Sequence, residues 1–399
     1  MFHWHVRQAS PTTRTSQPIA LLVLILTLVG SWNGTAHAAV APSNSLSATP
    51  SLWQTITLIK TAKPKVLDAT GWAQDILDTL KLHNLPSSKE NVCAVIAIIA
   101  QESSFVANPA VPNLGRLSEQ AIIQKLNQIP VLGGEAESFL NRFPNPRDSF
   151  MQRIRRAKTE RDLDVAYRNL VAGLMQAYQL DFIDDDLIEA NNEVRTIGAM
   201  QVGVDFASQY EEENQGHQLS LTEIYQLRDK LYTRKGGLYY GTLMLLGYET
   251  GYNKKLYRFA DFNAGRYTSR NAAFQHVIAN LANDPLILDG DLLIYDHGNI
   301  SDSVSTTEQM LRAVNYQYNL GLSDVQIRRD LTLEKTMTFN KTATYKNVTG
   351  LYRKLRKVEP PYAIVPSITL HSAKTSRVLT TEKFANTVNG RYQRCISSP

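Results

Sequence analysis

Three short polar segments of the chain could do chemistry, and the first is built on Glu102. An apolar run over Val92–Ala100 precedes it, and Ser103 follows it. A run that is apolar on every face is typical of a helix in a domain core. Burial and the negative end of the helix dipole both disfavour the carboxylate, so the pKa of Glu102 should be raised. A carboxylic acid that keeps its proton near neutral pH can protonate the leaving oxygen in glycoside cleavage.

Ser103 is expected to hydrogen-bond nearby backbone or the acid. The alternative interpretation of this segment is that Glu102 merely begins a solvated loop.

The other two segments carry side-chain amides beside glycines. In the second, Gly198 would let backbone approach a ligand closely, Met200 would form an adaptable apolar wall, and Gln201 would supply an amide. In the third, Asn263 is expected to present its amide at the end of a helix, with Gly265 at the C-terminal cap. Both segments therefore suit the binding of a polar ligand.

Taken in order, the three segments resemble the soluble lytic transglycosylases of the lysozyme-like superfamily, over about residues 85–280. The family pattern is Glu-Ser, then Gly-x-Met-Gln, then Tyr-Asn-Ala-Gly. More narrowly, the chain resembles a less characterised branch of exported, lysozyme-like bacterial proteins. The resemblance implies a catalytic Glu102 and a substrate-binding set, which comprises Ser103, Gly198, Met200, Gln201, Phe262 and Asn263.

The resemblance also implies a reaction that needs neither cofactor nor metal. Glu102 would protonate the β-1,4 glycosidic oxygen between N-acetylmuramic acid and N-acetylglucosamine in peptidoglycan, and the substrate's own acetamido group would stabilise the cationic centre. Glu102 would then act as base on the muramyl 6-hydroxyl and close a 1,6-anhydro ring. Substrate assistance removes the need for a second carboxylate. The candidates for one are Glu193, Asp205, Asp261 and Asp289.

The chain departs from the family in three respects. Residues 103–197, between Glu102 and Gly198, number 95, where the family has a few tens. Phe262 replaces the tyrosine whose hydroxyl is thought to contact the acid. The tail after about Ser301 has no counterpart in the minimal domain. Candidates to replace the missing hydroxyl are Tyr248, Tyr252 and Tyr267.

Two rival functions remain open. A goose-type lysozyme would hydrolyse the same bond and would need a water-activating carboxylate. A non-catalytic peptidoglycan-binding envelope protein would hold glycan in the cleft while the insertion docks a partner of unknown identity. A pure binder has no need of a buried acid, whereas Phe262 in place of tyrosine favours the binder.

Helices must position these segments, so the sequence predicts a mainly α fold. It predicts a lysozyme-like helical domain over residues 51–300 with a helical insertion at about 110–190, followed by an extension over 301–399 with little regular structure. Ser87 and Glu90 form a capping-box pattern at the start of the apolar helix. Further helices are expected at 219–232, 236–249, 255–263, 270–281 and 306–320.

The N-terminus predicts export. Arg7 and Arg14 precede a short apolar run, and Ala36-His37-Ala38 is a cleavage pattern, so residues 1–38 are interpreted as a signal peptide and 39–50 as a linker. The alternative is an uncleaved anchor, for which the run is short. No cysteine precedes Cys93, so a lipid anchor is not expected, and the mature protein is expected in the periplasm. A net charge of +5 is too small to indicate nucleic acid.

Two further patterns leave alternatives open. Cys93 and Cys395 are the two cysteines, and in an oxidising compartment they form either a disulfide or two unrelated thiols. A basic cluster comprises Arg153, Arg155, Arg156, Lys158 and Arg161. It is either a solvated helix face or, through Arg153, Arg155 and Arg156, a reader of carboxylates on peptide stems. The acidic run at 184–186 fits no known cation-binding loop.

Overall fold

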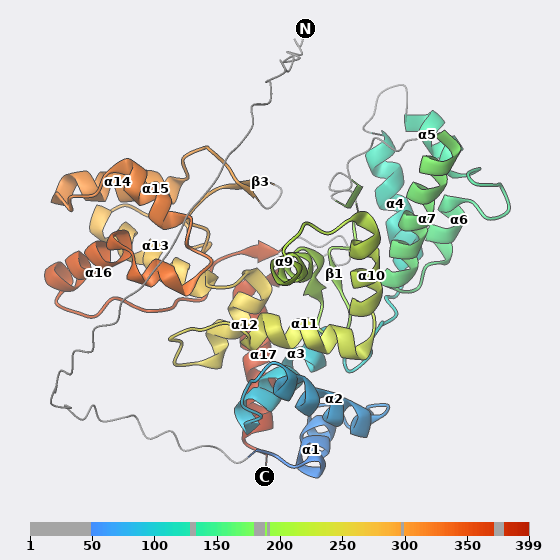
Figure 1. Cartoon of the computed structure of the whole chain (residues 1–399), viewed down its shortest axis with the longest axis horizontal. Helices are drawn as coiled ribbons and strands as arrows, with labels where there is room; N and C mark the ends of the chain where they lie inside the picture. Colours follow the sequence, from blue (N-terminus) through green and yellow to red (C-terminus); the bar gives the residue numbers. More distant parts are fainter. Residues whose placement is uncertain are drawn as a thin grey trace, which may run out of the picture. The chain divides into compact units, whose positions relative to one another are not determined.

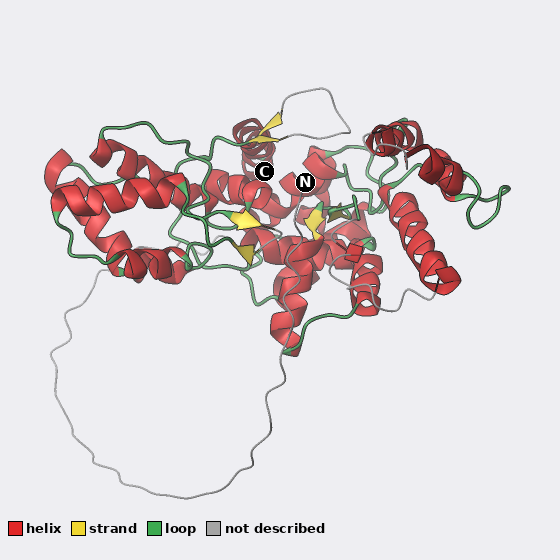
Figure 2. Cartoon of the chain, turned by 90° about the horizontal axis from the view of Figure 1, so that it is seen from above, coloured by secondary structure: helices red, strands yellow, loops and turns green. Residues whose placement is uncertain are grey.

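A computed structural model describes residues 49–127, 133–178, 188–189, 192–296, 299–370 and 379–398. The described chain is mainly helical, with 64% helix and 3% strand, as the sequence predicts (Figure 2). The proposed signal peptide, the linker up to residue 48 and the acidic run at 184–186 lie outside the described residues. In the part of the chain that is described, no helix has both the length and the apolar character to cross a membrane.

The largest group of elements packs around one apolar core, which we call the central core. Short antiparallel strands and helices from both ends of the chain contribute to it. They are α1 (Leu52–Ala62), α2 (Ala69–Leu82), α3 (Lys89–Glu102), β1 (Thr196–Ile197), β2 (Val202–Gly203), α9 (Val204–Gln215), α10 (Leu221–Leu231), α11 (Arg234–Leu246), α12 (Lys255–Ala264) and α17 (Thr381–Ile396).

Residues 114–127 and 133–178 form a helical lobe with a small core of its own around Phe150, Met151 and Ile154. Its elements pack on one another and are grouped in Figure 1: α4 (Leu114–Asn127), α5 (Gly133–Leu140), α6 (Phe150–Arg156) and α7 (Glu160–Tyr178). The prediction that the insertion is helical is confirmed.

A third group of elements surrounds α13 and encloses what we call the second core. It comprises α13 (Thr268–Ala282), β3 (Tyr295–Asp296), β4 (Asn299–Ile300), α14 (Thr306–Tyr318), α15 (Asp324–Leu331), the 3₁₀ helix η1 (Met337–Lys341) and α16 (Ala343–Arg356), with the hairpin β5 (Thr369–Leu370) and β6 (Leu379–Thr380) following it in the chain (Figure 1).

The predicted boundary at residue 300 is wrong for a physical reason. Phe274 and Val277, before that boundary, share the second core with Leu311 and Tyr352, after it. Cutting at residue 300 would divide one apolar core. The last helix, α17, belongs instead to the central core, because Ala385 and Val388 are buried there.

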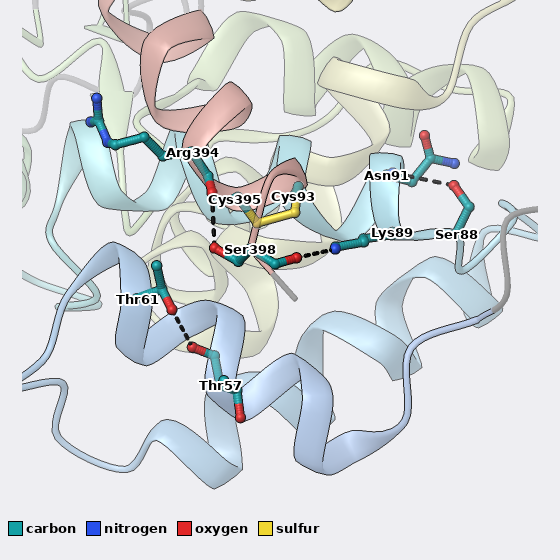
Figure 3. Close-up of a disulfide and its surroundings, with 9 residues drawn as sticks. All are labelled: Thr57, Thr61, Ser88, Lys89, Asn91, Cys93, Arg394, Cys395 and Ser398. Carbon is teal, nitrogen blue, oxygen red and sulfur yellow. Dashed lines mark hydrogen bonds between the residues drawn. A yellow bond between two sulfur atoms is a disulfide. The ribbon is translucent and has the colours of Figure 1, made fainter.

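A disulfide between Cys93 and Cys395 ties α17 to α3 (Figure 3). The two cysteines are 302 positions apart in the chain, and their Cα atoms lie 5.6 Å apart. Beside the bridge, the Lys89 ammonium donates to the Ser398 carbonyl. The predicted bridge is present, and it fastens the end of the chain to the helix that carries Glu102.

The apolar helix α3 starts one residue later than the capping pattern predicts. Ser88, not Ser87, is the N-cap, and its hydroxyl accepts from the backbone N–H of Asn91. Val92–Ala100 is buried throughout, as predicted from its uniform apolarity. The helix ends at Glu102, so only Gln101 separates the wholly buried segment from the candidate acid.

A candidate active site around Glu102

Glu102 is the last residue of α3, and its side chain is partly exposed. Within the described chain, its carboxyl group has no hydrogen bond and no ion pair. Burial raises its pKa from 4.5 to about 7, because a carboxylate that is partly removed from water and accepts no hydrogen bond is poorly stabilised. The group is therefore an accessible acid that holds its proton near neutral pH, as the sequence predicts.

The backbone directly after Glu102 is unusual. Ser104 and Phe105 have φ of 53° and 66°, in the left-handed region that few non-glycine residues adopt. The Phe105 ring is buried edge-on against Trp72, with centroids 5.5 Å apart, which holds the turn in place. Strain of this kind is concentrated at functional sites in proteins.

Ser103 is buried, and its hydroxyl donates to the Ile99 carbonyl at 3.3 Å. Of the two partners expected for Ser103, backbone or acid, the structure shows the backbone. The serine therefore helps to end the helix and is not bonded to the carboxyl group of Glu102.

The second predicted segment is the loop of the β1–β2 hairpin. The backbone N–H of Gln201 donates to the Gly198 carbonyl at 3.0 Å and closes this loop. Gly198 has φ of 82°, and a Cβ there would lie 2.3 Å from the Leu231 carbonyl oxygen. The glycine is thus required by the close approach of this loop to the end of α10. The expectation that it also lets backbone approach a ligand stays a prediction.

Met200 and Gln201 also have partners inside the protein. Met200 is fully buried against Gly241 of α11, so in this structure it packs the core and is not the expected apolar wall of a ligand site. The Gln201 amide nitrogen donates to Glu160 Oε2 at 3.1 Å, and its oxygen accepts from the Thr196 hydroxyl at 2.9 Å. Gln201 therefore joins the hairpin to the helical lobe.

The third segment ends α12, and Gly265 is its C-cap with φ of 111°, as predicted. Phe262 is buried in the central core, so its ring packs inside the protein and does not face a ligand. Asn263 is partly exposed and accepts a 3.0 Å hydrogen bond from the Thr381 hydroxyl of α17. The last helix thus positions this amide.

The three tyrosines proposed to replace the missing tyrosine hydroxyl donate their hydrogen bonds to groups other than Glu102 in the described chain. Tyr248 and Tyr252 donate to the buried Asp261 at 3.1 and 2.8 Å, and the Tyr267 hydroxyl donates to the Glu249 carbonyl. A phenol has one proton to donate, so none of the three supplies the hydrogen bond to Glu102.

Asp261 also accepts from the backbone N–H groups of Tyr267 and Ser269 and from the Thr268 hydroxyl. Burial raises the pKa of Asp261, and the hydrogen bonds from Ser269 and the two tyrosines oppose that rise. A buried carboxylate with five donors is structural. Asp261 therefore joins α12 to α13 and cannot activate a water molecule across a substrate.

The remaining candidates for a second carboxylate lie in different settings. Asp289 accepts from the Gln275 amide and the Asp291 backbone, which is a structural role. Asp205 is exposed in the first turn of α9, and Glu193 is exposed just before β1. Glu193 and Asp205 are the two that remain accessible.

All three motif segments contribute to the central core, through Ile99, Met200 and Phe262 among others. In the part of the chain described, however, no hydrogen bond joins Glu102 to Gln201 or Asn263. Sequence reasoning missed the residues that hold these amides, Glu160 and Thr381. A Thr159–Asp162 capping pattern marks the start of α7, but no local signal shows that Glu160 reaches the hairpin.

The chain belongs to a family described as "Protein of unknown function (DUF1615)", whose model matches residues 65–398. It is 35% identical over 332 residues to the "Uncharacterized protein YaiW" of Escherichia coli (strain K12), covering 83% of this chain and 86% of that protein. No solved structure matches. The matched span includes all three motif segments, the helical lobe and α17.

Proposed function

We propose that this protein cleaves the β-1,4 bond between N-acetylmuramic acid and N-acetylglucosamine in peptidoglycan, with Glu102 as general acid and base. The observation that carries the proposal is an accessible carboxyl group at the end of a buried helix, without a partner in the described chain and with a pKa of about 7. The order of the Glu-Ser, Gly-Ala-Met-Gln and Asn-Ala-Gly segments supports the glycan as substrate.

The reaction follows from what Glu102 can exchange. Its protonated form donates to the glycosidic oxygen as that bond breaks, and the substrate acetamido group stabilises the positive charge on the muramyl carbon. The resulting carboxylate removes the proton of the muramyl 6-hydroxyl, whose oxygen closes the 1,6-anhydro ring. Glu102 thus gives up one proton and regains one in each cycle, which suits an acid with a pKa near neutrality.

The test is digestion of purified peptidoglycan sacculi by the mature, disulfide-bonded protein, with the soluble products weighed by mass spectrometry. Products with 1,6-anhydromuramyl ends are expected from wild type, and about 10² to 10⁴-fold less product from Glu102→Gln at the same protein concentration and time. Products with reducing ends would instead indicate the hydrolytic, goose-type reaction. In that case Asp205→Asn and Glu193→Gln should be compared, because these are the accessible carboxylates.

A glycan-binding protein without activity is the second candidate, and one observation favours it. No tyrosine hydroxyl contacts Glu102 in the described chain, because Phe262 stands at the family position and the nearby phenols bind Asp261 or backbone. Sedimentation with sacculi, without any soluble product from wild type, would favour this function over cleavage.

A further inference from the structure

A basic groove of about 550 Å³ lies on the helical lobe, where the end of α6 meets the start of α7. Four cationic side chains and a single carboxylate line it, and its apolar part includes Val165 and Ala166. The charged residues are Arg153, Arg156, Lys158, Arg161 and Asp162. We call this hollow the basic groove.

Part of this positive charge is balanced within the protein, because Arg153, Arg156 and Arg161 each have a carboxylate within 4.0 Å. The Asp162 carboxylate accepts from the backbone N–H groups of Lys158 and Thr159, both at 2.9 Å, and so serves to cap α7. Asp148, outside the groove, binds Arg153 at 2.8 Å and lies 3.6 Å from Arg156.

The other cations of the groove are available to a ligand. The Arg156 side chain is 64% exposed, and the Lys158 ammonium has no ion pair in the described chain. Arg161 lies 4.0 Å from Asp229, at the outer limit of an ion pair. The groove therefore offers an anion at least two weakly paired cations.

The groove is connected to both polar segments of the candidate site. Asn108, six positions after Glu102, donates to the Thr159 hydroxyl at 3.2 Å, and the Val111 amide donates to the Lys158 carbonyl at 2.8 Å. On the other side, Glu160 accepts from Gln201. Residues 158–160 thus contact both the segment that follows Glu102 and the hairpin loop.

Resting on the proposed function, we propose that the basic groove holds the carboxylates of the peptide carried by the glycan strand next to the bond that is cleaved. Guanidinium groups bind carboxylates through paired hydrogen bonds. The apolar floor at Val165 and Ala166 suits the aliphatic parts of such a peptide.

The structure also corrects the set of residues expected to read the peptide. Arg155 binds Glu119 at 2.6 Å and Asn141 at 3.2 Å and does not line the groove. Lys158 and Arg161, which follow α6, take its place. This division supplies a matched control, because Arg155 and Arg156 are neighbouring exposed arginines on one helix.

The first experiment measures binding of a fluorescently labelled, synthetic stem peptide with free carboxylates to the full mature protein. Wild type should bind, and raising the salt from about 0.05 to about 0.5 M should weaken binding, because exposed charge pairs are screened. The double variant Arg156→Gln/Lys158→Gln should bind about tenfold more weakly, and Arg155→Gln should stay within about twofold of wild type. Unfolding midpoints of all variants should agree.

Three results would overturn the groove proposal: no peptide binding by wild type, equal weakening by Arg155→Gln, or binding of phosphatidylglycerol vesicles through Arg156 and Lys158 in place of the peptide. Digestion of peptide-stripped glycan separates this failure from that of the proposed function. If wild type and the double variant cleave stripped glycan equally but neither binds peptide, the enzyme stands and the groove proposal fails. If neither glycan is cleaved although the peptide binds, the proposed enzymatic function fails.

Discussion

Two glutamates, Glu102 at the end of α3 and Glu334 beside the second core, share a raised pKa but differ in their surroundings. Burial raises the pKa of both Glu102 and Glu334 from 4.5 to about 7. Glu334 is fully buried and accepts from the Tyr295 hydroxyl, the Leu292 amide and the Asn271 side chain. Glu102 is partly exposed and has no partner in the described chain.

The difference shows that a raised pKa does not by itself mark a catalytic acid. Three donors fix the Glu334 carboxyl group inside the second core, where no substrate can reach it. Glu102 is partly exposed to solvent, and the turn that follows it places Ser104 and Phe105 in the left-handed region. The Glu334 carboxyl group is held by hydrogen bonds inside the protein, whereas the Glu102 carboxyl group has no partner in the described chain.

The largest expected effect concerns the disulfide, which is present only on the Glu102 side of this comparison. Its long loop should contribute about 5 kcal/mol to the free energy of unfolding in the entropic account. Cys93→Ala/Cys395→Ala should therefore unfold at lower urea concentration. Hydrogen exchange should become faster in α3 and α17 and stay unchanged in α13 and α16. Equal acceleration in both cores would show that they unfold as one unit.

Glu102→Gln is expected to slow glycan cleavage by about 10² to 10⁴-fold, the usual contribution of a general acid. Below pH 4.5, where the Glu102 carboxyl group keeps its proton in the folded and the unfolded chain, the free energy of unfolding should stay within about 1 kcal/mol of wild type, because the described chain gives the carboxyl group no hydrogen bond to lose. The rate on sacculi and a urea titration measure both quantities. Cleavage at the wild-type rate would remove Glu102 from the mechanism.

Glu334→Gln should show the reverse pattern. Glutamine has one acceptor oxygen, so the donors from Tyr295, Leu292 and Asn271 cannot all be satisfied, at a cost of about 1–3 kcal/mol. Cleavage at a temperature where the variant is folded should match wild type. A variant that is as stable as wild type would mean that these hydrogen bonds contribute no net stability.

Local patterns in the sequence predicted the helical fold well. The periodicity and caps of α10–α14 gave their positions to within a few residues, and the uniform apolarity of Val92–Ala100 predicted the buried helix that ends at Glu102. The expected export and the presence of two cysteines made a disulfide one of two alternatives, the other being two unrelated thiols, and the structure shows the disulfide. These features are encoded within a few turns of chain or in a count of residues.

The surroundings of the site could not be predicted in this way, because they depend on contacts between distant segments. Gly198 is required by the Leu231 carbonyl, Gln201 is held by Glu160, and Asn263 is held by Thr381. A motif shows which residue types are present, but it does not show whether their polar groups face a ligand or each other. The return of α17 to the central core has no local signal either.

The dependence on pH gives the smallest effect and the sharpest separation of the two glutamates. Between pH 4.5 and about 7, each carboxyl group is protonated in the folded chain and ionised in the unfolded chain. The stability from these protons is therefore complete at low pH and is lost as pH rises toward 7. Glu334→Gln should remove the part of this pH-dependent loss of unfolding free energy that comes from Glu334, and Glu102→Gln should remove the part that comes from Glu102.

Activity should respond to Glu102 alone. The proton that Glu102 donates is lost above its pKa of about 7, so kcat/KM should fall roughly tenfold per pH unit on the alkaline side. Glu334→Gln should keep that midpoint, and the residual activity of Glu102→Gln should lose it. The measurement is kcat/KM on soluble glycan strands from about pH 5 to about pH 9. An alkaline limb that moves with Glu334→Gln, or that persists in Glu102→Gln, would assign the titrating proton to a group other than Glu102.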